Sequence, residues 1–329
     1  MQLDLETFLT ALYVMVDDLY QSHVRPHMPQ TGGPAPRLSD SEVLCLGLAA
    51  QWRSGVPWQS ERGLVRYVRK HLAHLFPQMI SQSAFNRRLR RLWGAFLLIQ
   101  EGVAEALGEG EGWEVMDCAP VPIARGARSF HPGWLEEVAR IGKGGNDRFF
   151  YGAHLLLVVN AQGMATGWTL AAGNIQDRWL AEVVLSSRAG APQCTGPRDP
   201  QGSPALDPPR DWMGPAQSGG RPHGCPILAD LGYSGAAWQR HWREDYGAQV
   251  LTPPVPERHA ARAWFSGLRQ KIETAFAALC GVFGLHFPGA HTTWGLITRI
   301  GAKIAAYNTG ILLNRQYGRA DLAFGTSIC

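Results

Sequence analysis

The chain has 329 residues, 45% of them hydrophobic and 18% charged, which excludes an intrinsically disordered chain and a small scaffold stapled by disulfides. The net charge of +4 and a pI near 8.8 favour polyanionic partners only mildly. The six cysteines show neither Cys-x-x-Cys nor a zinc-like spacing with histidine, which argues against a zinc site and a disulfide framework.

The compartment expected from these features is the cytoplasm. Scattered thiols are typical of a reducing environment. No basic segment precedes an apolar stretch at the N-terminus, and no run reaches the ~18 apolar residues of a membrane helix. We therefore expect neither a signal peptide nor a membrane span.

Residues 1–108 are predicted to form an all-helical domain. Apolar residues recur at helical spacing over 4–24, from about 40 to 53, and over 60–75. A further helix is expected to begin after Ser81 and to continue past Phe96. The sequence Leu38-Ser-Asp-Ser-Glu-Val43 has the form of a capping box, so it marks the start of the second helix.

Two successive clusters of basic residues lie in this helical region. They comprise Arg62, Arg66, Arg69 and Lys70, followed by Arg87, Arg88, Arg90 and Arg91. Helices that are rich in arginine and capped by serine are typical of a helix-turn-helix-like DNA reader, whereas a single cluster is equally well a solvated surface. Two clusters in succession favour DNA binding.

The pattern changes after residue 108, and residues 109–329 are predicted to form a layered α/β domain. The strand candidates are residues 113–118, 121–125, 149–159, 164–171, the run ending at Asp230, and 249–252. Four helices are expected: one begins near Asp177, one contains Trp238 and Trp242, one spans 268–279, and one spans about 293–316. Residues 186–224, rich in proline and glycine, are predicted to be a surface insertion.

Three acidic residues lie either at the expected end of a buried strand or beside the apolar stripe of a helix. Asp117 is expected at the end of a strand because Pro120 and Pro122 follow it, and Asp230 ends a second apolar run. Glu273 adjoins the apolar stripe of a helix. Three carboxylates form a hard oxygen site suited to Mg²⁺ or Mn²⁺.

Each of these residues also has an ordinary structural interpretation. A lone aspartate is often a turn or N-cap residue, and Glu273 is at the right spacing for an ion pair with Arg269. His154 is typical of a packed core histidine, and Cys118 has no assignable histidine partner that would make it a nucleophile. The metal site is therefore predicted from the combination of acids.

Several short motifs follow one another along most of the chain. In order they are Leu38-Ser-Asp-Ser-Glu-Val-Leu44, Ser81-Gln-Ser-Ala-Phe-Asn-Arg-Arg-Leu89, Asp117-Cys-Ala-Pro120, Tyr151-Gly152, Asp230-Leu-Gly-Tyr233, and Arg269-x-x-x-Glu273. With these motifs in this order, the sequence resembles the bacterial insertion-sequence transposases of the DDE type.

The resemblance implies a ribonuclease H-like catalytic domain with a mixed sheet flanked by helices. It implies that Asp117, Asp230 and Glu273 bind two Mg²⁺ or Mn²⁺ ions, and that Arg269 contacts DNA or the active site. The implied activity is cleavage at transposon ends and joining of the 3′-hydroxyls to target DNA. The implied partners are double-stranded DNA on the bacterial nucleoid and a second copy of the chain.

The sequence departs from the family pattern at several positions. Gln176 replaces a histidine before the acid Asp177, and His154 stands where the family often has lysine. Ser266 and Cys280 replace the tyrosine and lysine that flank the arginine and glutamate. Three functions remain open: an active transposase, a metal-dependent nuclease on the same fold, and an inactive or domesticated DNA-binding relative.

Overall fold

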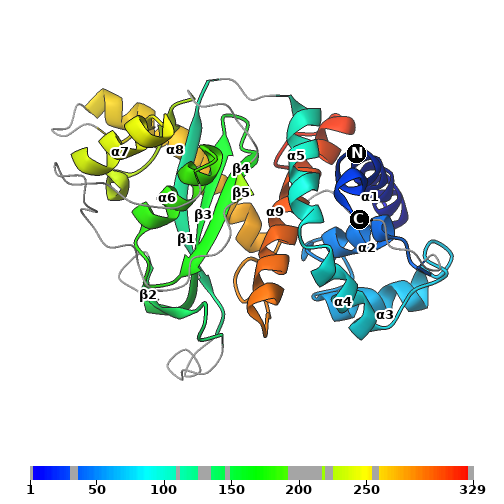
Figure 1. The fold of residues 1–329 in the computed structure, drawn as a ribbon. Helices are drawn as coiled ribbons and strands as arrows, with labels where there is room; N and C mark the ends of the chain where they lie inside the picture. Colours follow the sequence, from blue (N-terminus) through cyan, green and yellow to red (C-terminus); the bar gives the residue numbers. More distant parts are fainter. Residues whose placement is uncertain are drawn as a thin grey trace. The chain divides into compact units, whose positions relative to one another are not determined.

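The fold is described from a computed structural model of the chain (Figure 1). The described residues are 3–29, 36–108, 112–124, 135–144, 149–191, 217–218, 225–253 and 259–324, with side chains described from 266 onward in the last range. They divide into two compact units. The first comprises residues 1–108, 278–288 and 294–329, and the second comprises 109–277 and 289–293.

The first unit is helical. Its N-terminal part contains α1 (Leu5–Leu19), α2 (Asp40–Ala49), α3 (Glu61–His71), α4 (Gln82–Arg91) and α5 (Ala95–Leu107). Beyond α1 the chain continues as a π-turn to Val24 and a short 3₁₀ turn to His27. The predicted capping box is present, because Ser39 and Glu42 each bond the other's backbone N–H. The helix expected to continue past Phe96 is instead two helices, interrupted after Arg91.

Helix α9 (Thr293–Gln316) also belongs to the first unit almost throughout, which differs from the expected assignment of residues 109–329 to one domain. Its apolar residues do not form a single stripe, and its residues are buried from Leu296 to Asn314. The Lys303 ammonium donates to Gln51, and Arg299 pairs with Glu61. Helical spacing predicted this helix correctly, but the spacing does not reveal which neighbours bury a helix that is enclosed on all sides.

The second unit is built on a sheet of seven strands among its described residues. They are β1 (Glu114–Pro122), β2 (Arg140–Lys143), β3 (Phe149–Asn160), β4 (Ala165–Ala172), β5 (Gln217–Ser218), β6 (Ile227–Leu228) and β7 (Val250–Leu251). The order is β5-β4-β3-β1-β6-β7, and β2 pairs with the beginning of β3. Strands β1, β3, β4 and β5 are each antiparallel to their neighbour in this order, whereas β6 and β7 run parallel to β1. The predicted mixed sheet is confirmed.

Strand β1 passes through both prolines, so the prediction of two separate strands with Asp117 at an end was wrong. Even-numbered residues of β1 direct their N–H groups away from β3, as Glu114 does toward Pro226. Beyond Val115 no strand among the described residues pairs with that side of β1. The N–H groups that Pro120 and Pro122 lack would point to this unpaired side. The two prolines therefore cost the sheet no hydrogen bond between strands.

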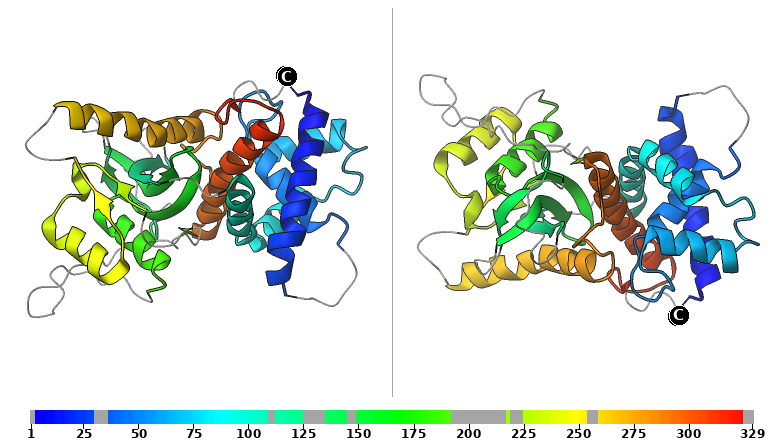
Figure 2. Two further views of the ribbon diagram at one scale, coloured as in Figure 1. Left: turned by 90° about the horizontal axis from the view of Figure 1, so that it is seen from above. Right: turned by 90° about the horizontal axis from the view of Figure 1, so that it is seen from below.

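Helices cover both faces of this sheet. Figure 2 shows α6 (Asp177–Arg188) and α7 (Ala236–Tyr246) on one face and α8 (His259–Gly281) on the other. The core between the sheet and the first two of these helices contains aliphatic strand residues such as Leu156 and the aromatic rings of Trp179, Trp238 and Trp242. The tryptophans that helical spacing placed in α7 are thus core residues.

The predicted insertion at 186–224 lies mostly outside the described residues. Its first three residues belong to α6, which ends at Arg188, and residues 217–218 form β5. Strand β2 was not predicted, because its four residues alternate weakly and carry only one aliphatic side chain. In the part of the chain that is described, no helix is long and apolar enough to cross a membrane.

Candidate functional site

Two of the three predicted acids lie just beyond the point where the parallel strands β1 and β6 stop pairing. Strands β1 and β6 pair Glu114 with Ile227 and Val115 with Leu228. Asp117 and Asp230 each lie two residues beyond the last paired residues of these strands, and the charge of Asp230 acts on Asp117. Asp230 follows β6 after one residue, Ala229, and its Oδ1 accepts the Gly232 N–H at 2.7 Å. The tight turn expected after Asp230 is thus fixed by the acid itself.

Helix α8 contributes a cation to this pair of acids. The Arg269 guanidinium donates to Asp117 Oδ2 at 2.9 Å, while Asp117 Oδ1 accepts the N–H of Cys118 at 2.9 Å. Glu273 lies one helical turn after Arg269 and is exposed. The ion pair that Arg269 makes is therefore with Asp117, and not with Glu273 as the helical spacing alone allowed.

The charges of all three acids act on the same guanidinium. Burial disfavours the charged form of Arg269, but Asp117, Asp230 and Glu273 together raise its pKa. Burial also raises the pKa of Asp117, an effect that Arg269 opposes and Asp230 reinforces. The cluster therefore places several negative charges around one cation in a partly buried site.

The donor chemistry of the site suits a hard divalent ion, but its arrangement is not a ligand shell. Adjacent aspartate oxygens are what Mg²⁺ and Mn²⁺ prefer. Within the described ranges, however, no three His, Cys, Asp or Glu side chains come together in a group that could hold a metal ion. Both oxygens of Asp117 are engaged, one by Arg269 and one by the backbone. A metal ion at Asp117 would have to share this carboxylate with Arg269 or displace it.

A fourth acid, Asp177, adjoins the cluster from the opposite face of the sheet. The Cys118 thiol hydrogen-bonds to Asp177 and to the Tyr233 hydroxyl, whose oxygen lies 3.2 Å from the sulfur. Asp177 also lies 3.8 Å from Nδ1 of His154, and the charge of Asp230 reaches it. Burial raises the pKa of the Cys118 thiol well above its usual range, so this thiol is not a ready nucleophile.

Asp177 was missing from the predicted site. Its position at the first residue of an amphipathic helix gave it an ordinary role, in which the acid complements the helix dipole. The available signal was the segment Gly173 to Asp177, which resembles a family motif that ends in an acid. His154, predicted as a core histidine, is largely buried, and its Nδ1 also contacts the Ile175 carbonyl oxygen at 3.2 Å.

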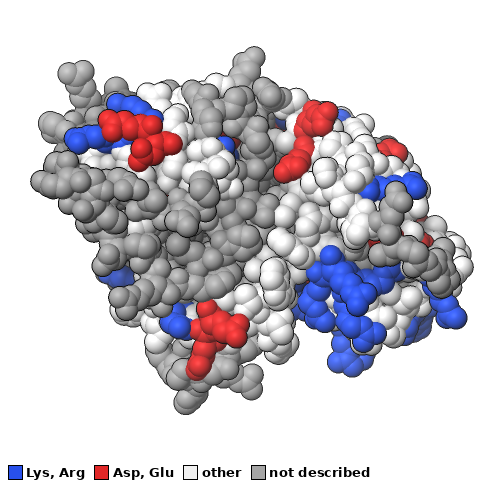
Figure 3. All heavy atoms as spheres, in the orientation of Figure 1, with Lys and Arg blue, Asp and Glu red and all other residues white. Residues whose placement is uncertain are grey.

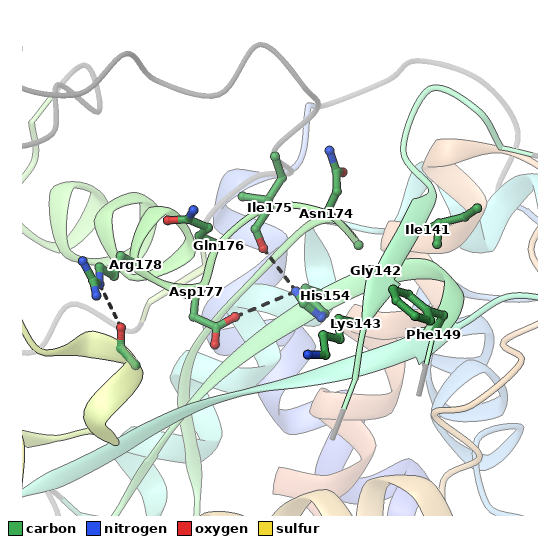
Figure 4. Close-up of a pocket in the computed structure, with 12 residues that line it drawn as sticks. Ile141, Gly142, Lys143, Phe149, His154, Asn174, Ile175, Gln176, Asp177 and Arg178 are labelled. Carbon is green, nitrogen blue, oxygen red and sulfur yellow. Dashed lines mark hydrogen bonds and ion pairs between the residues drawn. The ribbon is translucent and has the colours of Figure 1, made fainter. Parts of the chain in front are cut away.

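A pocket opens beside Asp177, with a volume of about 620 Å³ (Figure 4). It lies between strand β2, the start of β3, and the turn that leads into α6. Its wall depends on close backbone contact, because a side chain at Gly142 would place Cβ 2.0 Å from the Gly173 carbonyl oxygen. The pocket is lined by Ile141, Gly142, Lys143, Phe149, His154, Gly173, Asn174, Ile175, Gln176, Asp177, Arg178 and Gly232.

The predicted DNA-binding cations of the first unit lie on α3 and α4, where Figure 3 shows blue side chains gathered. The exposed ones are Arg62, Arg66, Arg69, Lys70, Arg87, Arg90 and Arg91. Arg69 also donates to the Ile80 carbonyl at 2.7 Å. Arg88 is different, because it is partly buried and binds the Leu38 carbonyl and the Asp40 carboxylate.

Helices α3 and α4 do not form a tight helix-turn-helix. The connection between them runs from Leu72 to Ser81, a span of ten residues. A DNA-reading helix-turn-helix joins its helices through about three or four residues. The expectation of two adjacent basic helices holds, whereas the compact turn between them is absent.

Comparison with known proteins gives little further guidance. No family model matches the sequence, and no curated protein matches it. Among solved structures, the Mos1 transposase paired-end complex with the left transposon end is similar over 85% of this chain and 82% of that chain. The sequence identity is 12% and the TM-score is 0.21, which is too low to carry an argument about fold or function.

Proposed function

We propose that the chain is a DNA transposase of the DDE type, which binds transposon ends, cleaves phosphodiester bonds and joins the 3′-hydroxyls to target DNA. The observation that carries the proposal is the convergence of three acids from β1, the turn after β6, and α8 on the single guanidinium of Arg269. These are the residues that the family resemblance identifies as the acidic triad and its neighbouring arginine.

The arrangement of strands supports the same proposal. Strands β1, β3 and β4 form an antiparallel meander, and β6 and β7 extend the sheet parallel to β1. This mixed sheet with helices on both faces is consistent with the ribonuclease H-like fold expected from the resemblance. Asp117 lies within the central strand β1 and Asp230 just beyond the neighbouring strand β6.

Asp117 and Asp230 would hold the divalent ion or ions, and Glu273 would complete the set from α8. When bound, the ions would stabilise the leaving oxygen and activate the attacking water or 3′-hydroxyl. Arg269 would release Asp117 and pair with a DNA phosphate, for which a guanidinium is well suited. The exposed cations of α3 and α4 would hold the duplex through its phosphates.

Cleavage of the DNA that flanks this gene tests the proposal. A labelled duplex would be incubated with the protein in Mn²⁺ or Mg²⁺, and wild type would be compared with Asp230→Asn and with Glu244→Gln, which removes an exposed acid from α7. We expect cuts at a repeated boundary with wild type and Glu244→Gln, and none with Asp230→Asn. Cleavage by Asp230→Asn would contradict the assignment of the triad.

A second candidate is a DNA-binding relative that no longer cleaves. It is favoured by the ion pair between Arg269 and Asp117, and by the lack of a three-ligand group among the described residues. This candidate predicts tight, salt-dependent binding to duplex DNA and no cuts in either metal. The same cleavage experiment therefore separates the two candidates.

A further inference from the structure

The two segments that carry Asp117 and Asp230 lie where the sheet no longer joins them. Among the described residues, the backbone pairing of β1 with β6 ends at Val115 and Leu228. Both aspartates come two residues later, so no hydrogen bond of that ladder fixes the distance between them. The charge of Asp230 also acts unfavourably on the charged form of Asp117. Contacts outside the ladder must therefore hold the two segments together.

A chain of side-chain hydrogen bonds makes such a contact. The hydroxyl of Tyr233, three residues after Asp230, donates to the Cys118 sulfur at 3.2 Å. Cys118, the residue after Asp117, donates in turn from its thiol to the carboxylate of Asp177, the first residue of α6. The chain thus joins the turn after β6 to β1, and β1 to α6, at the level of the two acids.

This chain lies in the core, on the face of the sheet opposite the Asp117 carboxylate. Cys118 is paired with Leu156 and Asp117 with Leu157, so the two neighbouring side chains of β1 point to opposite faces. Tyr233 is fully buried in the same core as Leu156. A buried hydroxyl that loses its partner is costly, and a closely packed ring cannot shift freely. The bond from Tyr233 to Cys118 therefore fixes one segment against the other.

The first turn of α6 also holds the second segment directly. Arg178, next to Asp177, donates from Nε to the Gly232 carbonyl at 2.8 Å (Figure 4). Gly232 donates its own N–H to the Asp230 carboxylate at 2.7 Å. Two neighbouring residues of one helix therefore bind both acid-bearing segments, one through a thiol and one through a backbone carbonyl. The residues of this α6 clamp are Cys118, Asp177, Arg178 and Tyr233.

We propose that the α6 clamp is a set of positioning residues, which keeps Asp117 and Asp230 close enough to act on one bound group. Groups that act together in a site must be held to within about 0.5 Å of their working geometry, and a pair of segments without a shared ladder needs such support. The proposal rests on the proposed function for what the aspartates bind. The positioning itself is a property of the protein without metal or DNA.

Amide hydrogen exchange of the metal-free protein tests the clamp without any ligand or cleavage. The reporters are the N–H groups of Cys118 and Gly232, because they bond to the carboxylates of Asp117 and Asp230. Tyr233→Phe removes one hydroxyl and keeps the ring, so both segments should open more often and exchange roughly five-fold faster. Nuclear magnetic resonance of the deuterated protein resolves the two amides.

Tyr246→Phe is the matched control. It removes another buried hydroxyl from the same core, one that donates to Glu182 at 2.6 Å, and it should also lower the thermal unfolding midpoint. Its two reporter amides should nevertheless exchange as in wild type, which separates positioning from a general loosening of the core. Cys118→Ser keeps a donor and an acceptor and should behave like wild type, whereas Cys118→Ala should match Tyr233→Phe.

The contact of Arg178 is tested in the same way. Arg178→Met removes the guanidinium and keeps most of the stem, so the Gly232 amide should exchange faster while the Cys118 amide changes less. Arg240→Met, which removes an exposed charge from α7, is the control and should change neither amide.

Mn²⁺ binding, followed by the free-ion signal in electron paramagnetic resonance, is the second readout. Tyr233→Phe should bind the ion several-fold more weakly than wild type, because the two carboxylates are no longer held at one separation. Tyr246→Phe should bind it as wild type does. Equal affinity of Tyr233→Phe and wild type for Mn²⁺ would contradict the positioning role.

The clamp proposal would also be overturned if Tyr233→Phe left both exchange rates unchanged, or if Tyr246→Phe raised them equally. Neither result depends on metal or on cleavage. Faster exchange confined to the clamp variants, together with no Mn²⁺ binding and no cleavage by wild type, would support the clamp and contradict the proposed transposase. Metal-dependent cleavage by wild type, together with unchanged exchange in Tyr233→Phe, would do the reverse.

Discussion

Arg269 is bonded to the Asp117 carboxylate, the group that a metal ion at this site would use. Its guanidinium is bonded to Asp117 Oδ2, and both side chains are largely buried, with 28% of the arginine and 19% of the aspartate side chain exposed. A charge pair in such a setting is screened only partly by water. The pair therefore neutralises the site when no metal is present and competes with metal for the same oxygen.

Replacing Arg269 should accordingly strengthen metal binding in the absence of DNA. In Arg269→Gln the competing cation is gone, so we expect Mn²⁺ to bind roughly ten-fold more tightly, equivalent to about 1.4 kcal/mol. The decrease of the free-ion signal in electron paramagnetic resonance measures this affinity directly. Arg243→Gln, which removes a charge from the exposed surface of α7, should leave it unchanged. Equal or weaker Mn²⁺ binding by Arg269→Gln would show that Arg269 does not compete for the acid pair.

Glu182 is a buried acid of a different kind, because it serves the packing of α6 against α7. Its carboxylate accepts hydrogen bonds from Trp242 Nε1 at 2.9 Å and from the Tyr246 hydroxyl at 2.6 Å, and it lies 2.9 Å from His241 Nε2. Burial disfavours a charged His241, but the bonds and charges of Glu182 and Asp245 outweigh it and raise the pKa of the imidazole. The structure therefore favours the protonated ring.

This arrangement makes the stability of the second unit depend on pH. The folded pKa of His241 lies above the value of 6.5 for an unperturbed histidine, so its contribution is complete below that pH. The contribution is lost as the pH rises through the folded pKa. Between about pH 6 and pH 8.5, the thermal unfolding midpoint of wild type should therefore fall by roughly 2–4 °C more than that of His241→Gln. Parallel pH profiles of the two proteins would rule out this role for His241.

At the scale of elements, α4 has two functions that a basic pattern cannot separate. Arg87, Arg90 and Arg91 are exposed, whereas Arg88 joins α4 to the start of α2 through Asp40. The sequence shows four arginines in five positions, and only the tertiary contacts distinguish the one that is partly buried. DNA binding and stability are therefore expected to respond to different members of the same cluster.

The double variant Arg87→Ala and Arg90→Ala should bind duplex DNA more weakly while keeping its thermal unfolding midpoint. Each phosphate that the protein no longer neutralises should reduce the slope of log affinity against log salt by about 0.9. Arg88→Ala should instead lower the unfolding midpoint by several degrees, because it removes the cationic partner of the partly buried Asp40. Fluorescence anisotropy at several salt concentrations measures the slope, with Arg240→Ala and Arg243→Ala on α7 as the control pair. An unchanged slope in the α4 variant would remove this helix from DNA binding.

The elements themselves could largely be predicted from the sequence, because apolar spacing is a local signal. The long helices, β3 and β4, and the apolar run before Asp230 all follow from it. The extent of β1 could not be predicted, because Pro120 and Pro122 end a strand only if that side of the strand has a partner. The contact of Arg269 with Asp117 spans 152 residues of sequence, and no local pattern specifies it.

At the scale of the whole molecule, the first unit is assembled from three separate parts of the sequence. The Trp52 ring packs against Phe8 at 5.2 Å and against Phe283 at 4.9 Å between ring centroids. Phe283 precedes α9, and the buried Lys303 of α9 donates to both the Gln51 side chain and the Phe283 carbonyl. Residues 1–108 thus share their core with residues more than 170 positions later in the chain.

A polypeptide of residues 1–108 should therefore fail to fold by itself. Without α9 and Phe283, Trp52 would lose its contact with the Phe283 ring and Gln51 Oε1 would lose the bond from Lys303. Deleting a large buried group costs about 3–5 kcal/mol for a single aromatic residue. That cost is comparable to the whole stability of a small domain, which is roughly 5–15 kcal/mol. We expect helical circular dichroism without a cooperative thermal transition.

The matched comparison joins residues 1–108 to residues 278–324 through a flexible linker, which restores all three parts of the unit. This polypeptide should unfold cooperatively and bind duplex DNA with the salt dependence of the full chain, because the exposed cations of α3 and α4 are unchanged. A cooperative transition at the same temperature for residues 1–108 alone would show that α9 is not needed. In that case the boundary after residue 108 would separate two independently folding domains, as the pattern of the sequence first indicated.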